Sequence, residues 1–191
     1  MAMIAGGAEA IIELREGKII KKRVQKRYRL AEIDERLRAE RTRAEARLTS
    51  EARRLGVPTP IIYDVGEHEI IMQHIEGLQL KNVLTPALSE RAGELVGRLH
   101  SGGMVHGDLT TSNFILSGDK LYMIDFGLAY FDSSVEAQGV DVHVLFQTYE
   151  STHEGFEELI RRFSAGYRRR FKNAGAVLQR VKEIEARGRY A

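Results

Sequence analysis

The chain has 191 residues, of which 43% are hydrophobic, and its 29 lysines and arginines nearly balance its 27 aspartates and glutamates. This length and composition predict one folded domain, or two small lobes that share a core, and they exclude a largely disordered or low-complexity chain. Because the sequence has no cysteine, disulfides, thiolate metal sites and thiol nucleophiles are also excluded, so any chemistry must come from oxygen and nitrogen groups.

The first part of the chain is predicted to form a small sheet with one long helix. Short runs rich in β-branched residues predict strands at residues 10–14, 18–24, 61–65 and 69–75. Glu16 and Gly17 separate the first two runs and favour a hairpin turn. Between the second and third runs, apolar residues at spacings of four and seven predict one face of a charged helix over residues 33–55. These apolar residues are Ile33, Leu37, Ala44, Leu48 and Leu55.

The second part of the chain is predicted to be mainly helical. Glu76 and Gly77 break the strand pattern, so we expect an N-lobe over residues 1–75, a hinge at 72–77 and a C-lobe over 78–191. Apolar spacing predicts helices at residues 88–99, 156–171 and 178–184. Apolar runs at residues 114–116 and 121–124 predict a second small hairpin. The expected fold class is therefore α+β with two lobes, of which the second is reduced.

Two loops that flank this second hairpin carry the residues that indicate chemistry. Residues 106–113 read His-Gly-Asp-Leu-Thr-Thr-Ser-Asn, and residues 125–127 read Asp-Phe-Gly. These match the catalytic and metal loops of the protein-kinase-like fold. Since Mg²⁺ or Mn²⁺ prefers hard oxygen ligands, we predict that Asn113 and Asp125 hold the metal against the phosphates of ATP. Asp108 is predicted to accept the proton of the incoming hydroxyl.

A kinase-like site also needs a cation on the nucleotide phosphates and a carboxylate that holds this cation. By position we predict Lys21, in the second strand, and Glu45, in the long helix, for these two roles. Lys22 points to the opposite face of the strand, whereas Arg23 shares the face of Lys21 and competes for its role.

Two further segments are predicted to contact the nucleotide. The glycine-rich loop over the phosphates is reduced to Gly6, Gly7, Ala8 and Glu9. Its backbone N–H groups can approach phosphate, but the carboxylate of Glu9 repels phosphate unless it turns away or pairs with a cation. The hinge is expected to offer backbone hydrogen bonds to adenine from Met72, Gln73, His74 and Ile75. Met72 is expected to border the base.

Together these motifs resemble those of the small atypical serine/threonine kinase of the KEOPS complex, a family also called PRPK or piD261. The resemblance rests on Gly7-Ala8-Glu9-Ala10, Lys21, Tyr28-Arg29, Arg41-Thr42, Glu45-Ala46, residues 106–113, residues 124–128, Gly139-Val140-Asp141 and Arg187-Gly188-Arg189. It implies a protein-kinase-like fold and an ATP- and Mg²⁺-dependent serine/threonine kinase and ATPase. It also implies work with other KEOPS subunits, including a tRNA-binding metalloenzyme, in forming threonylcarbamoyladenosine next to the anticodon.

The sequence departs from ordinary protein kinases at two points. Gly107 replaces the arginine that reads an activation-loop phosphate, and no Ala-Pro-Glu follows Gly127. The platform for a peptide substrate is therefore expected to be short or absent, which favours water as the phosphoryl acceptor. Two alternatives stay open: a small-molecule phosphotransferase of the aminoglycoside or choline type, for which the 64 residues after Gly127 leave little room, and a noncatalytic nucleotide-binding scaffold.

Charge is segregated along the chain. Residues 15–54 carry 15 basic and 7 acidic side chains, residues 55–160 carry 4 and 16, and residues 161–191 carry 10 and 2. We expect the basic segments to meet a polyanion, and the tail at residues 185–191 to contact tRNA or a partner, unless these are solvated helix faces and a frayed terminus. With no charged leader and no long apolar run, the protein is expected to be cytoplasmic and free of membranes.

Overall fold

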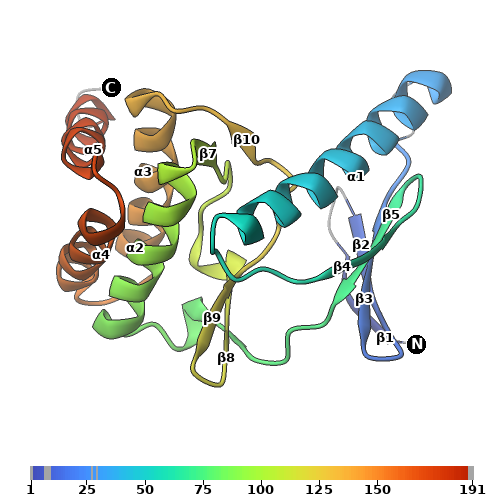
Figure 1. Ribbon diagram of the computed structural model, residues 1–191, viewed down its shortest axis with the longest axis horizontal. Coiled ribbons are helices and arrows are strands. Elements are labelled where there is room, and N and C mark those ends of the chain that lie inside the picture. The colour runs from blue at the N-terminus through green and yellow to red at the C-terminus, as the bar shows by residue number, and fades with distance from the viewer. Residues whose placement is uncertain (1, 7–9, 27, 29, 189–191) are drawn as a thin grey trace.

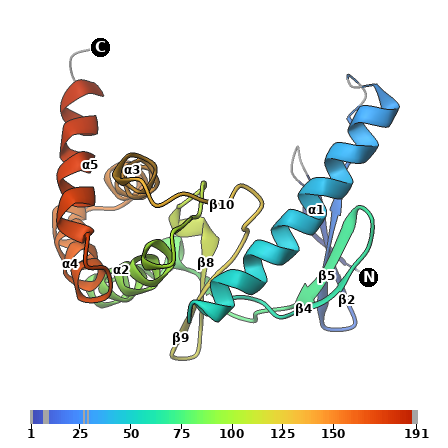
Figure 2. The ribbon, with the colours of Figure 1, turned by 45° about the horizontal axis from the view of Figure 1, so that its top comes forward.

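A computed structural model describes residues 2–6, 10–26, 28 and 30–188 (Figure 1). The described chain is α+β. A five-stranded sheet and one long helix form the N-lobe, and four helices with two small sheets form the C-lobe. Figures 1 and 2 show the sheet of the N-lobe at one end of the molecule and α5 at the other. The predicted fold class is confirmed.

The N-lobe sheet is antiparallel throughout, with the strand order β1-β2-β3-β5-β4. Its strands are β1 (Ala2–Gly6), β2 (Ala10–Arg15), β3 (Lys18–Arg23), β4 (Ile62–Val65) and β5 (Glu69–Gln73). The predicted hairpin is confirmed, with Glu16 and Gly17 both at positive φ in its turn. We did not predict β1, because its apolar and small residues show no alternation and it is specified only by pairing with β2.

The long helix α1 (Ala31–Arg54) confirms the predicted helix, and its buried face is shifted from the predicted one towards polar residues. Ile33, predicted to face the core, is 43% exposed, whereas Glu45 is buried. The buried face consists mostly of small and polar residues: Asp34, Ala39, Thr42, Glu45, Ala46, Leu48, Thr49 and Ala52. Of the predicted face, Leu48 is buried and Leu37, Ala44 and Leu55 are half-buried, so the apolar spacing found one edge of the buried face and missed its polar part around Glu45.

The segment after α1 ties the two lobes together. The backbone N–H of Met123 donates to the carbonyl of Pro58 at 2.8 Å, so the chain leaving α1 is bonded to β9 (Lys120–Met123). Both ribbon views place the C-terminal end of α1 close to β9 (Figures 1 and 2). At the hinge, Gly77 lies so close to the carbonyl of Leu116 that a side chain there would collide with it. The lobes are thus joined by close backbone contacts at the hinge and at the segment that follows α1.

The C-lobe contains the predicted second hairpin and several strands that are too short for sequence periodicity to reveal. β8 (Phe114–Ser117) pairs with β9 and with the two-residue β6 (Leu78–Gln79). β7 (Met104–Val105) pairs with β10 (Tyr130–Phe131). Two single 3₁₀ turns, Leu80–Asn82 and Thr111–Asn113, precede α2 and β8. These short pieces surround the two loops that carry the candidate site.

Four helices complete the C-lobe: α2 (Pro86–Ser101), α3 (Val135–Thr152), α4 (Phe156–Arg170) and α5 (Ala174–Gly188). Three were predicted, and α3 was not among them. α2 and α4 pack backbone against backbone, since a side chain at Gly93 or Gly166 would collide with a carbonyl of the other helix. Of the predicted tail, residues 185–188 are the last turn of α5, and residues 189–191 lie outside the described residues.

Within the described residues, none of the helices combines the length and apolar character needed to span a bilayer.

Candidate active site

Lys21 joins the N-lobe to the loop that carries Asp125. Its Nζ donates to Glu45 Oε1 at 2.7 Å and to Asp125 Oδ1 at 2.8 Å. The Lys21 side chain is 11% exposed and that of Glu45 3%, whereas that of Asp125 is 43% exposed. The structure therefore brings together three residues predicted for one site, and Asp125 is the member that reaches solvent.

Arg23 is a fourth member of this cluster. Its Nη2 donates to Glu45 Oε2 at 2.6 Å, while Lys21 uses the other oxygen of the same carboxylate. Lys21 and Arg23 were predicted as competitors because they share one face of β3. The structure shows that both bind Glu45.

The electrostatics of the cluster favour the charged forms of Lys21 and Asp125. Burial by itself lowers the pKa of the Lys21 ammonium, but the carboxylates of Glu45 and Asp125 outweigh burial and raise this pKa. Burial by itself raises the pKa of the Asp125 carboxyl, but Lys21 and the N–H of Gly127 outweigh burial and lower it. At neutral pH Lys21 and Asp125 therefore form an ion pair, and an ionised Asp125 suits the predicted role of an oxygen ligand.

The conformation of Asp125 also suits a ligand. Its φ is 62°, in the left-handed region that residues other than glycine seldom adopt. In this conformation Oδ1 accepts from the N–H of Gly127 at 3.3 Å as well as from Lys21. Aspartate tolerates this region better than most residues, because a short polar side chain can bond to nearby backbone.

Asn113 and Asp108 lie together at the start of β8. Asn113 Nδ2 donates to the backbone carbonyl of Asp108 at 2.8 Å and to its Oδ2 at 2.9 Å. Because the amide nitrogen is used for both bonds, the amide oxygen is turned to its other side and can serve as a ligand. The carbonyl of Asn113 accepts from the N–H of Ile124 at 2.9 Å, which ties this loop to the one that carries Asp125. Carboxylate and amide oxygens from two bonded loops fit a hard divalent cation.

His106 fixes the spacing between the two loops from a buried position. Its Nδ1 accepts from the N–H of Asp108 at 3.3 Å, and its Nε2 lies 3.0 Å from the carbonyl of Ile124. A backbone N–H can only donate and a carbonyl can only accept, so the imidazole proton is assigned to Nε2. The ring of Phe126, which is buried, packs beside that of His106 at a centroid distance of 5.0 Å.

Asp141 of α3 anchors the start of the loop formed by residues 106–113. Its Oδ2 accepts from the N–H of His106 and its Oδ1 from that of Gly107, both at 2.9 Å. His100 Nε2 lies 3.1 Å from Oδ2, and His100 Nδ1 lies 2.7 Å from the hydroxyl of Tyr167. The sequence assigned no role to Asp141, His100 or Tyr167. Asp141 entered the sequence analysis only as part of the Gly139-Val140-Asp141 motif, which carries the resemblance and indicates no contact with residues 106 and 107.

The position of Gly107 has a steric reason. Its φ is 80°, and an added Cβ would collide with the carbonyl of Leu128. The loop at residues 106–113 and the chain after Gly127 thus approach too closely for the arginine that ordinary kinases carry here.

The residues predicted to contact the nucleotide are placed in part. Gly6 ends β1, while Gly7, Ala8 and Glu9 lie outside the described residues. Met72 lies in β5 between Ile19 and Ile62. The backbone N–H of Gln73 donates to the carbonyl of Ile61 at 2.8 Å, so this N–H is not free to bind adenine. Of the predicted hinge residues, His74 and Ile75 follow the end of β5 and stay as predicted partners of adenine.

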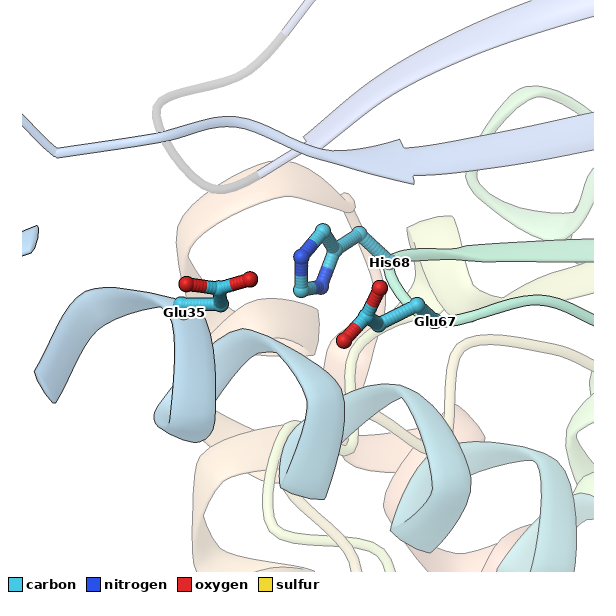
Figure 3. A group of neighbouring side chains, drawn as sticks. All are labelled: Glu35, Glu67 and His68. Carbon is cyan, nitrogen blue, oxygen red and sulfur yellow. The ribbon is translucent and has the colours of Figure 1, made fainter. Parts of the chain in front are cut away.

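A group of side chains with metal-binding atoms also occurs in the N-lobe. One ligand atom from each of Glu35, Glu67 and His68 lies within 4.8 Å of the others (Figure 3). Both carboxylates are exposed, so water solvates them without a cation. This group shares no residue with the kinase-like loops, and it does not change the assignment of Asn113 and Asp125.

Comparisons with known proteins agree with this geometry. The RIO domain family matches residues 12–140. The chain is 45% identical to a probable serine/threonine-protein kinase BUD32 homolog of Archaeoglobus fulgidus, covering 96% of this chain and 94% of that protein. It is 44% identical to the KEOPS complex subunit Bud32 of Pyrococcus abyssi, covering 100% and 96%. The chain belongs to the Bud32 family of RIO-domain proteins.

Some relatives of this Bud32-family chain are longer. A probable bifunctional tRNA threonylcarbamoyladenosine biosynthesis protein of Methanosarcina mazei is 60% identical over 99% of this chain, which covers 36% of that protein. The chain thus spans about a third of the length of such relatives.

Solved structures show the shared fold. A Rio2 kinase–ADP/Mg²⁺–phosphoaspartate complex from Chaetomium thermophilum aligns with a TM-score of 0.65 at 18% identity, covering 95% of this chain and 70% of that one. An ADP-bound aminoglycoside phosphotransferase, APH(2'')-Ib, aligns with a TM-score of 0.67 at 14% identity, covering 94% and 80%. At these identities the likeness extends to the fold alone, so the small-molecule alternative gains no support from it.

Proposed function

We propose that this Bud32-family chain is an ATP- and Mg²⁺-dependent phosphotransferase. The observation that carries the proposal is the direct contact of Lys21 Nζ with Asp125 Oδ1 at 2.8 Å, with Glu45 behind the lysine. This contact brings a phosphate-binding cation of one lobe to a metal-binding carboxylate of the other.

Each residue of the site then has a role in the transfer. Asn113 and Asp125 would hold Mg²⁺, which supplies neutralisation of charge on the phosphate oxygens. Lys21 would exchange Asp125 for phosphate and remain bonded to Glu45. Asp108 would orient the attacking hydroxyl and accept its proton. Asn113 holds the Asp108 carboxylate for this role, because its Nδ2 donates to Asp108 Oδ2 at 2.9 Å. Asp141 would keep Asp108 in place through the N–H groups of His106 and Gly107.

We propose that water is a principal phosphoryl acceptor, which makes the chain an ATPase. Only residues 128–134 separate the Asp-Phe-Gly loop from α3, and two of these residues form the short strand β10. Such a short segment offers little surface to hold a peptide beside Asp108. A serine or threonine hydroxyl remains the second acceptor, in line with the kinase name of the Archaeoglobus relative.

The relatives also support a place in tRNA modification. One bears the name of a KEOPS subunit, and longer ones are named for threonylcarbamoyladenosine biosynthesis. We therefore propose that the chain works with the other KEOPS subunits, including the metalloenzyme that modifies tRNA, and that tRNA reaches it indirectly or through the basic residues near its end.

Incubation of the protein with γ-labelled ATP, with and without partner subunits and tRNA, tests both proposals. Released phosphate indicates the ATPase, and labelled protein indicates the kinase. The absence of both products in every mixture would favour a noncatalytic scaffold.

A further inference from the structure

Arg23 ends β3 on the same face as Lys21, and its backbone is fixed at this position. Its N–H donates to the carbonyl of His68 at 2.9 Å, across to the turn before β5. Figure 3 shows His68 at this turn, beside the first part of α1. The Arg23 side chain is 7% exposed, so its guanidinium is nearly removed from water. A guanidinium is held in such a place by close ionic partners.

The two oxygens of Glu45 serve two different cations. Oε1 accepts from Lys21 at 2.7 Å and Oε2 from Arg23 at 2.6 Å. Lys21 has a second partner in Asp125, which must be given up when Lys21 binds phosphate and Asp125 binds metal. Arg23 is charged at any physiological pH and contacts the carboxylate that stays in place during this exchange.

Arg23 also lies beside the metal loop. A Cβ added to Gly127 would lie 3.4 Å from Arg23 Nη2, 3.3 Å from Glu45 Oε2 and 3.1 Å from Asp125 Oδ1. The Arg23–Glu45 pair therefore borders the turn that presents Asp125, and a side chain at Gly127 would crowd all three charged groups.

We propose that Arg23 is a positioning residue for phosphoryl transfer, resting on the function proposed above. It occupies one oxygen of Glu45, so that only the other oxygen is offered to Lys21 and the lysine remains available to the nucleotide phosphates. Without Arg23, both oxygens of a buried carboxylate face Lys21, which is then held back from phosphate.

The test compares ligands with and without phosphates. Calorimetry with Mg²⁺–ADP and with adenosine is carried out on the wild type, Arg23→Met and Arg23→Lys, with Lys22→Met as the matched control. Lys22 is the neighbouring cation on the opposite face of β3, and its side chain is 41% exposed. Arg23→Met should weaken Mg²⁺–ADP binding about tenfold and leave adenosine binding within about twofold. Arg23→Lys should recover part of this loss, and Lys22→Met should match the wild type.

A double variant separates positioning from general damage. In the Glu45→Gln background the neutral amide no longer holds either cation strongly, so adding Arg23→Met should weaken Mg²⁺–ADP by less than about twofold. The inference is overturned if Arg23→Met weakens both ligands alike, if it matches Lys22→Met, or if its effect is fully additive with Glu45→Gln. If the wild type binds neither ligand, the proposed function fails together with the inference. If the wild type binds Mg²⁺–ADP and Arg23→Met binds it with the same affinity, only the inference fails.

Discussion

The ion-pair cluster between the lobes and the polar anchor within the C-lobe both hold a carboxylate against several donors, but only the first leaves a carboxylate open to solvent. Asp125 is 43% exposed and contacts Lys21, a flexible side chain. Asp141 is 1% exposed and accepts from two backbone N–H groups and His100. The exposed carboxylate can exchange partners and suits a ligand. The buried one has rigid partners and suits a support.

The comparison predicts that changes in the first cluster affect turnover and changes in the second affect stability. When water can enter, an exposed carboxylate such as Asp125 can replace its lysine partner by a metal ion at little cost in free energy. Breaking the hydrogen bonds to a buried carboxylate such as Asp141 instead leaves its donors without partners. The following variants test this division.

Asp125→Asn should have the largest effect. It removes the charge of the proposed metal ligand, so ATP turnover should fall by roughly a thousandfold. The free energy of unfolding should change by less than about 1 kcal/mol, because the carboxylate is exposed. Steady-state phosphate release and urea denaturation measure the two quantities. A variant that keeps more than about a tenth of wild-type turnover would contradict the assignment.

Asp141→Asn should mainly lower stability, whereas Asp125→Asn mainly lowers turnover. An amide nitrogen in place of one oxygen would face an N–H donor, so the free energy of unfolding should fall by about 2–4 kcal/mol. Asp119→Asn, in the exposed turn between β8 and β9, is the matched control and should stay within about 0.5 kcal/mol of the wild type. Urea denaturation at pH 7 compares the two, and equal stabilities would remove Asp141 as the anchor.

Acid should abolish the stability that the Asp141 carboxylate provides relative to asparagine at this position. Burial by itself raises the pKa of this carboxyl, but His100 and His106 outweigh burial and hold its pKa below the ordinary 3.8. Its contribution to stability is therefore complete above about pH 4 and is lost as the pH falls through the lowered pKa. The difference in unfolding free energy between the wild type and Asp141→Asn should be constant from pH 5 to 7 and shrink below pH 4. If this difference in unfolding free energy grows in acid instead, the pKa of Asp141 is raised by folding and not lowered.

Tyr167→Phe should have the smallest effect. It removes the hydroxyl 2.7 Å from His100 Nδ1 and leaves the ring in its buried place. The expected loss is about 1 kcal/mol of unfolding free energy, with ATP turnover within about threefold of the wild type. Thermal denaturation and phosphate release check this. A loss of turnover well beyond threefold, with the free energy of unfolding lowered by no more than about 1 kcal/mol, would show that His100 takes part in catalysis and not only in support.

The loops of the candidate site were largely predictable because their residues are neighbours in sequence. Asp108 and Asn113 lie in one loop, and Asp125 directly follows a strand whose hairpin pattern is local. Lys21 and Glu45 were predicted from position alone, and their pairing across 24 residues is what the structure adds. Their catalytic roles, like those of the glycine loop and the hinge, stay predictions.

What the sequence by itself determined is the pair of loops, the two hairpins and most of the helices, since each depends on residues a few positions apart. Tertiary structure alone decided the buried face of α1, the sharing of Glu45 between Lys21 and Arg23, and the anchoring of residues 106 and 107 by Asp141. The contact between Lys21 and Asp125 spans 104 residues. Such contacts balance charge in a buried place, and that balance depends on which distant groups the fold brings within hydrogen-bonding distance.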